Sequence, residues 1–370
     1  MKIAVTVTRW LVGLLFIFSG LIKANDPLGL SFKMLEFFEA WGWHFFDSYT
    51  LGLSIIMNIC EVLAGVAVII GWRIKWVSWF LLLLILFFTF LTGYVLFSNK
   101  IKECGCFGDC VPLSGINTFL KDIVLLLLIL FIFFNTTSIR SFFSAKISLS
   151  ILLTTLFITT AGQLYALKYL PFLDCLPYKK GNHILNEMKV PAGAVTDSST
   201  ITFKYKKKGK EVEFDQSHFP ADFDSTYEYI DRYDKLIRKG NAEAAIIDFA
   251  LRTLTGADTT QGILTQKDKY IMLFAKNFNH SVEWQNQFNE VLRISLRKSI
   301  PVYLVTSDAD KATTLFKNVM ILKCDATVIK TAARVNPTYF FMSRDLIVDK
   351  LSYVDQKKIN HRLNSLAFTN

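Results

Sequence analysis

The chain has few charged residues, few histidines and few prolines for its 370 residues. Charged side chains make up 19% of it, hydrophobic residues make up 52% and include 33 Phe, and the mean hydropathy is positive. This composition excludes a disordered chain, which needs low hydrophobicity, and argues against an ordinary soluble enzyme. The sequence contains no GxGxxG, P-loop, HExxH or GxSxG motif and no internal repeat, and its five His are mostly scattered. A His-based metal site is therefore not expected.

The net charge of +10 raises the question of a nucleic-acid partner. The excess of Lys and Arg is spread thinly over both halves of the chain, and the short run Lys206-Lys207-Lys208 is the densest basic stretch. Nucleic-acid binding needs a concentrated basic patch. We therefore expect no nucleic-acid partner.

Long apolar runs fill the first half of the chain. A bilayer core of about 30 Å requires roughly 20 mainly apolar residues per helix. Five segments meet this requirement, over residues 3–22, 48–72, 76–97, 119–138 and 147–167. The first has no small-x-small cleavage site after its apolar run, so we predict a retained helix rather than a signal peptide. The sequence thus predicts a protein that crosses the membrane five times, with the lipid bilayer as a partner.

Basic residues in the short connections set the predicted orientation. With the N-terminus inside, the inner segments carry no acidic residue and the basic residues Lys2, Arg9, Arg73, Lys75, Arg140 and Lys146. This pattern satisfies the positive-inside rule. The sequence therefore predicts a cytoplasmic N-terminus and a C-terminal domain outside the cytoplasm. Residues 31–46, rich in aromatic side chains, are predicted to form an interfacial helix.

The six cysteines are distributed unevenly, and three fall within seven residues of one predicted outer loop. They are Cys60, Cys104, Cys106, Cys110, Cys175 and Cys324. Thiols in an oxidising compartment tend to pair, so Cys110 could bridge to Cys104 or Cys106, and the connectivity is left open. One thiol of the loop would then be spare, and Cys175 follows the fifth span on the same side. The four thiols Cys104, Cys106, Cys110 and Cys175 are therefore candidate catalytic residues for disulfide exchange.

Three interpretations of these cysteines are open. The disulfide could simply staple the loop, or the thiols could exchange electrons with a membrane quinone as acceptor. A metal site is disfavoured, because Asp109 would have to serve as the fourth zinc ligand, and we expect no metal.

Glu61 is the one acidic residue deep inside a predicted span. An ionisable side chain in a bilayer is costly unless it is paired, so it indicates either structural pairing or a proton or quinone site. Arg9 is a candidate partner, although it should lie nearer the inner surface. Cys60 cannot share a helix face with Glu61 and is expected to be a small core residue.

Residues 3–138 resemble four-helix membrane proteins of the DoxX type and their relatives similar to MauE. The resemblance rests on Arg9, the segment 18–27 (FSGLIKANDP), Glu61 and the loop that begins Cys104-Gly-Cys-Phe-Gly. The whole chain resembles a Bacteroidetes group with a fifth helix and a periplasmic domain joined through residues 170–181. The resemblance implies quinone-linked or disulfide-maturation chemistry in the inner membrane.

The second half is predicted to be an α/β structure. Alternating residues around a Lys-Lys-Gly-Lys turn predict a hairpin of strands 201–205 and 212–214. A helix over 227–239 and a strand over 245–251 are expected to follow. The remaining predicted elements are strand 270–275, helix 282–297, strand 301–306, helix 309–316, strands 339–342 and 346–354, and a closing helix over 356–366.

The order of these elements resembles a thioredoxin fold. Val335-Asn-Pro-Thr338 is similar to the entry of that fold's cis-proline strand. Redox-active members carry Cys-x-x-Cys at the start of the first long helix, where residues 279–285 (NHSVEWQ) contain no cysteine, and Ser281 is expected to cap the helix. Cys324 is expected to be buried or idle. Partner docking beside Pro337 and Thr338 is therefore the predicted role.

The sequence as a whole predicts four parts: a DoxX/MauE-like four-helix membrane domain (1–140), a fifth transmembrane helix (141–170), a β-hairpin and helix connector (171–240) and a thioredoxin-like domain without Cys-x-x-Cys (241–370). The leading hypothesis is a membrane thiol–disulfide or quinone-linked redox component, or a maturation factor, with a periplasmic protein as partner. A non-catalytic scaffold with a structural disulfide is the alternative. A solute permease built around Glu61 is a weaker one, because no inverted repeat is visible.

Overall fold

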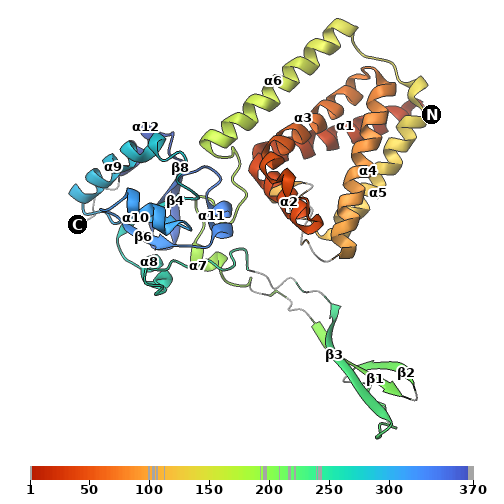
Figure 1. Ribbon diagram of the computed structural model, residues 1–370. Helices are drawn as coiled ribbons and strands as arrows, with labels where there is room; N and C mark the ends of the chain where they lie inside the picture. The colour runs from red at the N-terminus through yellow and green to blue at the C-terminus, as the bar shows by residue number, and fades with distance from the viewer. Residues whose placement is uncertain are drawn as a thin grey trace. The chain divides into compact units, whose positions relative to one another are not determined.

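The computed structural model describes residues 2–98, 101, 105, 107–111, 113–191, 193–194, 198–207, 209–215, 218–220, 222–238, 240 and 244–365. The chain divides into two compact units. One consists of Met1–Gly181 together with Ala250–Asn370, and the other is Asn182–Phe249. The first unit contains all the long helices and the larger sheet (Figure 1). The two units are described separately below.

Five helices of the described chain are long and apolar enough to cross a membrane, which confirms the five predicted spans. They are α1 (Lys2–Asn25), α3 (Thr50–Ile70), α4 (Ile74–Ser98), α5 (Gly115–Phe134) and α6 (Ala145–Tyr169). Helices α1, α3, α4 and α5 pack as a bundle, and α6 contacts α3 and α1 (Figure 1). The bundle core is made of Val, Leu, Ile, Ala and Phe side chains, while many other large apolar residues face outward, as a lipid solvent requires.

Helices α1 and α3 approach each other closely because glycines lie where they cross. A Cβ atom on Gly65 would lie 2.6 Å from the carbonyl oxygen of Gly13, and one on Gly13 would lie 2.9 Å from that of Gly65. Small residues at such crossings are the usual means of bringing two helix backbones together in a membrane. This crossing joins the middle of α1 to the inner half of α3. Gly20 makes a second close approach nearer the charged residues described below, since its Cβ would lie 3.1 Å from the Asn58 carbonyl oxygen.

Two elements replace the single interfacial helix predicted over residues 31–46. They are helix α2 (Pro27–Trp41) and the 3-10 segment η1 (His44–Tyr49). Asp26 begins α2 by accepting a hydrogen bond from the Gly29 N–H at 3.1 Å, and Pro27 takes the first helical position. Gly42 ends the helix in the left-handed region, with a φ of 71°.

A five-stranded sheet follows α6 in the first unit. Its order is β6 (Met320–Lys323), β5 (Val302–Thr306), β4 (Lys269–Ala275), β7 (Thr338–Ser343) and β8 (Leu346–Ser352). Strands β4, β5 and β6 are parallel to one another, and β7 is antiparallel to both β4 and β8. Five helices accompany the sheet: α8 (Thr260–Leu264), α9 (Val282–Arg297), α10 (Ala309–Leu315), α11 (Ala326–Ala332) and α12 (Gln356–Ser365).

This α/β region has a continuous aromatic core. Trp284 and Phe288 of α9 pack with Phe316 and with Tyr339 of β7. Residues 270–275 of β4 are fully buried, so both faces of the sheet are covered. The predicted strands and helices of this region are confirmed within a few residues, and α8, β6 and α11 are additional elements. The Asn336–Pro337 peptide bond is cis.

The second unit contains helix α7 (Ile184–Glu187) and a three-stranded antiparallel sheet in the order β2-β1-β3. The predicted hairpin is confirmed as β1 (Ser198–Lys207) and β2 (Lys210–Asp215). The helix predicted over 227–239 is wrong, because these residues form strand β3 (Tyr227–Arg238) paired along β1. Its tyrosines suit a pleated surface, and pairing with β1 outweighs the charged, helix-like composition. The strand predicted over 245–251 is also wrong, since those residues form bends and irregular backbone.

The close crossing of α1 and α3 gives a direct test of the bundle. Replacing Gly65→Ala should lower the free energy of unfolding by about 1–3 kcal/mol, because the added methyl overlaps the Gly13 backbone. Thermal denaturation in detergent, followed by size-exclusion chromatography, measures the change. Gly52→Ala in the same helix is the matched control, because nothing lies within 4 Å of its Cβ position. Equal loss of stability in both variants would contradict the proposed crossing.

Candidate functional site

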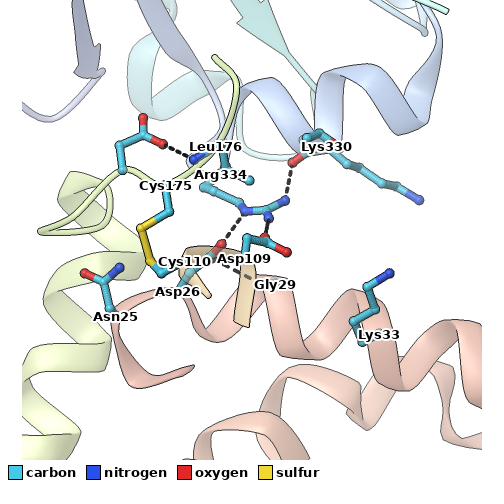
Figure 2. A network of polar contacts seen from close by, with 12 residues as sticks. Asn25, Asp26, Gly29, Lys33, Asp109, Cys110, Cys175, Leu176, Lys330 and Arg334 are labelled. Carbon is cyan, nitrogen blue, oxygen red and sulfur yellow. Dashed lines mark hydrogen bonds and ion pairs between the residues drawn. A yellow bond between two sulfur atoms is a disulfide. The ribbon is translucent and has the colours of Figure 1, made fainter. Parts of the chain in front are cut away.

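A disulfide joins Cys110 to Cys175 at the predicted outer end of the bundle (Figure 2). Cys110 ends the 3-10 turn η2 (Gly108–Cys110), and Cys175 lies in the segment after α6. Cys110 is therefore bridged to Cys175 rather than to Cys104 or Cys106, the two pairings within the loop that the sequence left open. Asn25, the last residue of α1, exchanges two hydrogen bonds with Leu173 at 2.8 and 3.0 Å and so brings the second segment to the loop. Cys104 and Cys106 lie outside the described residues.

Arg334 binds the acidic residue before the first disulfide cysteine. Its guanidinium contacts Asp109 at 2.8 Å and Asp26 at 2.7 Å, between the two carboxylates (Figure 2). The Arg334 side chain is 5% exposed, and Asp26 also caps α2 with its other oxygen. Three segments distant in sequence therefore meet at one guanidinium, which suits Arg because its fork binds two carboxylates at once.

Lys350 makes the equivalent contact at the second disulfide cysteine. Its Nζ lies 2.8 Å from Asp174, the residue before Cys175, and the Lys350 side chain is 4% exposed. Burial lowers the pKa of Lys350, and the neighbouring Asp174 opposes that shift. Both disulfide cysteines thus follow an aspartate that is held by a buried cation of the α/β region.

The segment that carries Arg334 is itself fixed by Lys276. The Lys276 Nζ donates to the Arg334 carbonyl at 2.8 Å, and its backbone N–H donates to Asn336 Oδ1 at 2.7 Å. Burial, reinforced by the charge of Arg334, lowers the pKa of Lys276 to about 8. Pro337 is buried and the Thr338 hydroxyl donates to the Val335 carbonyl at 2.7 Å, so these predicted docking residues are part of the same ordered turn.

Glu61 is paired inside the bundle with Lys23, not with Arg9. The two side chains form an ion pair, each is 1% exposed, and the Ser19 hydroxyl donates to the other Glu61 oxygen at 3.0 Å. The expectation that Arg9 could be the partner is therefore wrong. The positive charge comes instead from the outer end of α1, four residues after Ser19, on the same helix face.

Arg9 has a different position, near the other end of the bundle. Its guanidinium donates to the carbonyls of Val68 and Ile69 at the end of α3, and to that of Arg140. The last carbonyls of a helix have no partner within the helix, and a buried cation satisfies them. Arg9 thus connects the end of α3 to the segment before α6.

A large apolar cavity lies between α2, α3 and α4. Its volume is about 350 Å³, and its walls include Lys23, Lys33, Cys60 and Gly105 together with Phe37, Trp41, Leu84 and Phe88. Three further wall residues, Ile56, Phe80 and Phe87, are 59%, 40% and 41% exposed on the outer surface of the bundle. The cavity is therefore bordered by residues of the lipid-facing surface, by Lys23 and by Gly105, the residue between Cys104 and Cys106.

A smaller cavity of about 20 Å³ lies beside the disulfide. Lys23, Asp26, Cys110 and Cys175 are among the residues that line it. Such a volume holds about one water molecule. Lys23 therefore borders both the apolar cavity and the space next to the disulfide.

Five apolar helices, four of them packed in a bundle, define a multi-pass membrane protein. A family model described as "Methylamine utilisation protein MauE" matches residues 1–135, which contain α1 to α5. A second model, described as a domain of unknown function (DUF8463), matches residues 199–239 in the smaller unit. No curated protein and no solved structure matches the chain. The membrane part is thus similar to the MauE family.

The three cations that organise this site, Lys23, Arg334 and Lys350, were not predicted from the sequence. Lys23 lies in the segment 18–27 on which the family resemblance rests, but a lysine at a helix end is ordinarily expected to reach the interface. Neither Arg334 nor Lys350 belongs to a sequence motif that would have indicated a role in the site. The repeated Asp-Cys pairs at 109–110 and 174–175 could have suggested that cations hold both cysteines.

The ion pairs Arg334–Asp109 and Lys350–Asp174 should slow the attack of an external thiol on the Cys110–Cys175 disulfide. In the double variant Arg334→Met, Lys350→Met, we expect dithiothreitol to reduce Cys110–Cys175 at least about tenfold faster, equivalent to ~1.4 kcal/mol, because both cysteine segments lose their anchor. Timed mass-tagging of the released thiols measures the rate. Lys311→Met is the control, since its pair with Asp308 is exposed and such pairs contribute about 0–1 kcal/mol. Equal reduction rates in all three proteins would contradict the anchoring role.

Cys324 should be inert in the folded protein. It is buried, and burial raises its pKa to about 12, so roughly one thiol in ten thousand is ionised at pH 8. We expect N-ethylmaleimide to label Cys324 at pH 8 after denaturation but not before, as measured by peptide mass spectrometry. Labelling at the same rate in both states would contradict this expectation.

Proposed function

We propose that the protein is an inner-membrane thiol–disulfide component that passes electrons from thiols outside the cytoplasm to a membrane quinone. The observation that carries this proposal is the apolar cavity. Its wall includes Gly105, which lies between Cys104 and Cys106, and residues on the lipid-facing surface of the bundle. A lipid-soluble acceptor could therefore reach the cysteine loop without leaving the membrane.

The cavity residues fit a quinone. A volume of about 350 Å³ falls within the range of small-molecule sites, which is roughly 300–1,000 Å³. Aromatic and aliphatic walls suit the ring and the start of an isoprenoid tail. The ammonium groups of Lys23 and Lys33 are the polar groups that could bind a ring oxygen. When bound, a quinone would supply an acceptor for two electrons and two protons.

The cysteines would act in two exchange steps. A thiolate of a reduced partner protein attacks the Cys110–Cys175 disulfide, and the partner's second thiol then displaces the mixed disulfide. The partner leaves oxidised, and Cys110 and Cys175 are left as thiols. These thiols then reduce a Cys104–Cys106 disulfide by the same exchange and re-form Cys110–Cys175. Oxidation of the Cys104 and Cys106 thiols back to a disulfide would pass two electrons to quinone and release the two thiol protons at the outer surface.

The α/β region would bind the partner rather than exchange electrons. Its parallel β4, β5 and β6 and antiparallel β7 and β8 support a thioredoxin-like fold. The start of α9, where redox-active members carry their cysteines, has Ser281 at the N-cap position without a capping side-chain bond. We propose that the surface beside Pro337 and Thr338 receives the partner's chain. Support for this comes from Arg334, which belongs to the same turn and binds Asp109, the residue before Cys110.

The proposed location rests on charge and chemistry. The inner connections are rich in Lys and Arg, which supports a cytoplasmic N-terminus, and a disulfide supports a periplasmic C-terminal side. The similarity to the MauE family, whose description names methylamine utilisation, agrees with the disulfide-maturation chemistry that the sequence resemblance implies. The resemblance to DoxX-type proteins and to the Bacteroidetes group agrees with this proposal.

One observation favours the alternative of a non-catalytic scaffold. The disulfide joins two segments that Arg334 and Lys350 already hold, so it could serve as a staple between the bundle and the α/β region. A staple would stay oxidised whatever the state of the quinone pool. A redox relay would not.

The redox state of the loop cysteines separates these two functions. In membranes supplied with a reduced protein dithiol, we expect Cys110 and Cys175 to accumulate as thiols when quinone is depleted and to re-form their disulfide when quinone is restored. Gel shifts after mass-tagging measure both states. Cysteines that stay fully oxidised in both conditions would support the scaffold and contradict the relay.

The cavity can be tested with a matched pair of variants. Ile56→Trp should fill the cavity and slow quinone-dependent reoxidation at least about tenfold, because Ile56 forms part of its wall. Leu83→Trp is the control, since Leu83 is similarly exposed to lipid (61% against 59%) but does not line the cavity. Protection of Cys60 from a lipid-soluble maleimide by quinone gives an independent measure of occupancy. Equal reoxidation and equal protection in the two variants would exclude this cavity as the quinone site.

A further inference from the structure

A second buried acid lies close to the Lys23–Glu61 pair. Asp122 of α5 is 1% exposed, lies 2.8 Å from the Nζ of Lys121, and accepts a hydrogen bond from the Thr92 hydroxyl at 3.1 Å. Lys121 is 21% exposed, and its ammonium group lies over the ring of Phe107 in the cysteine loop. Lys121 therefore connects a buried carboxylate to the side of the bundle that carries the disulfide.

A small cavity connects the two acid–lysine pairs. Its volume is about 20 Å³, and its wall includes Glu61, Lys23, Asp122 and Lys121 as well as the Ser19 side chain. A polar space of this size holds about one water, which needs two to four polar partners. These side chains provide them. One water would thus complete a hydrogen-bonded connection between Asp122 and Glu61.

Among the residues that the structure describes, the charged groups in the wall of this cavity balance one another. The titratable residues in its wall are Lys23 on α1, Glu61 on α3, and Lys121 and Asp122 on α5, and the remaining wall residues apart from Ser19 are apolar. Helix α4 contributes Ile85 and Phe88 to the wall and Thr92 to Asp122. Two acids and two lysines face one another with no net charge, so a proton can move among them without leaving an unpaired ion.

Burying the pairs Lys23–Glu61 and Lys121–Asp122 costs desolvation free energy, and holding the helices together does not require them. Charged residues inside a bilayer are costly and mark proton relays or substrate paths by default. A pair of apolar residues of similar volume would pack as well, since buried ion pairs are often neutral or worse for stability than their hydrophobic replacements. Here two such pairs face one water-sized cavity, and Lys23 also borders the apolar cavity.

We propose that Lys121, Asp122, Glu61 and Lys23 form a proton-transfer route from the outer side of the bundle to the apolar cavity. This inference rests on the proposed function, because it assigns the source of the protons that quinone reduction consumes. Each reduction takes two electrons from a dithiol and two protons. The thiol protons are released at the outer surface. Two protons enter through Asp122, cross to Glu61, and leave the Lys23 ammonium for the quinone oxygens.

The test separates binding, chemistry and proton supply. In purified protein in nanodiscs, reduced loop thiols are reoxidised with ubiquinone-1 from pH 5.5 to 9. Asp122→Asn should leave quinone protection of Cys60 unchanged and slow reoxidation at least about tenfold, with loss of the wild-type pH profile. Asp122→Glu should restore the rate and the profile. Glu39→Gln, a carboxylate-to-amide change on the exposed face of α2, is the control and should behave as wild type.

Each alternative outcome has a distinct meaning. Wild-type protein that shows no quinone-dependent reoxidation would overturn the proposed function and the route with it. Wild-type reoxidation together with an unchanged rate and pH profile in Asp122→Asn would overturn the route alone. If Asp122→Asn does not fold, Thr92→Val removes one hydrogen bond to Asp122 without removing its charge, and it should shift the midpoint of the pH profile. An unshifted midpoint would contradict the route.

Discussion

Lys23 and Glu61 are both buried in the bundle, and each charge is tolerated there because the other neutralises it. An unpaired charge at this depth would be costly, and removing one partner of a buried pair costs about 3–5 kcal/mol. The pair therefore ties the outer end of α1 to the middle of α3, at the place where glycines let the two helices approach. The cavities described above share one wall residue, Lys23, so this pair also sets their arrangement.

The region outside the helices is organised by a related principle. Two buried cations of the α/β region, Arg334 and Lys350, each need a carboxylate, and each finds one in the residue before a disulfide cysteine. The disulfide and the ion pairs therefore constrain the same two chain segments. Both cysteines line a small water-sized space that Lys23 also borders, and Arg334, which holds Asp109, is itself bound by Lys276. Reduction of the disulfide would therefore release one constraint on both segments and leave the ion pairs of Arg334 and Lys350 to hold them.

Much of this architecture could be predicted from the sequence, because its causes are local. Runs of about twenty apolar residues predicted all five spans, and alternation around the Lys-Lys-Gly-Lys turn predicted the β1–β2 hairpin. The strand β3 was missed because its charged residues resemble an exposed helix, and only pairing with β1 makes it a strand. The partners of the site were beyond prediction for a similar reason. Lys23 and Glu61 are 38 residues apart, and Cys110 and Cys175 are 65 apart, so the fold decides those contacts.

The central claim is that electrons move from the outer cysteines to a quinone in the apolar cavity. The most direct measurement is the absorbance change of ubiquinone-1 when fully reduced, purified protein in nanodiscs is mixed with it anaerobically. The account predicts one quinol formed for each disulfide regained, and no more than background in the variant Cys110→Ser, Cys175→Ser, once its remaining loop thiols have been blocked. Disulfides that form without quinol, or quinol that forms equally in the blocked variant, would contradict it.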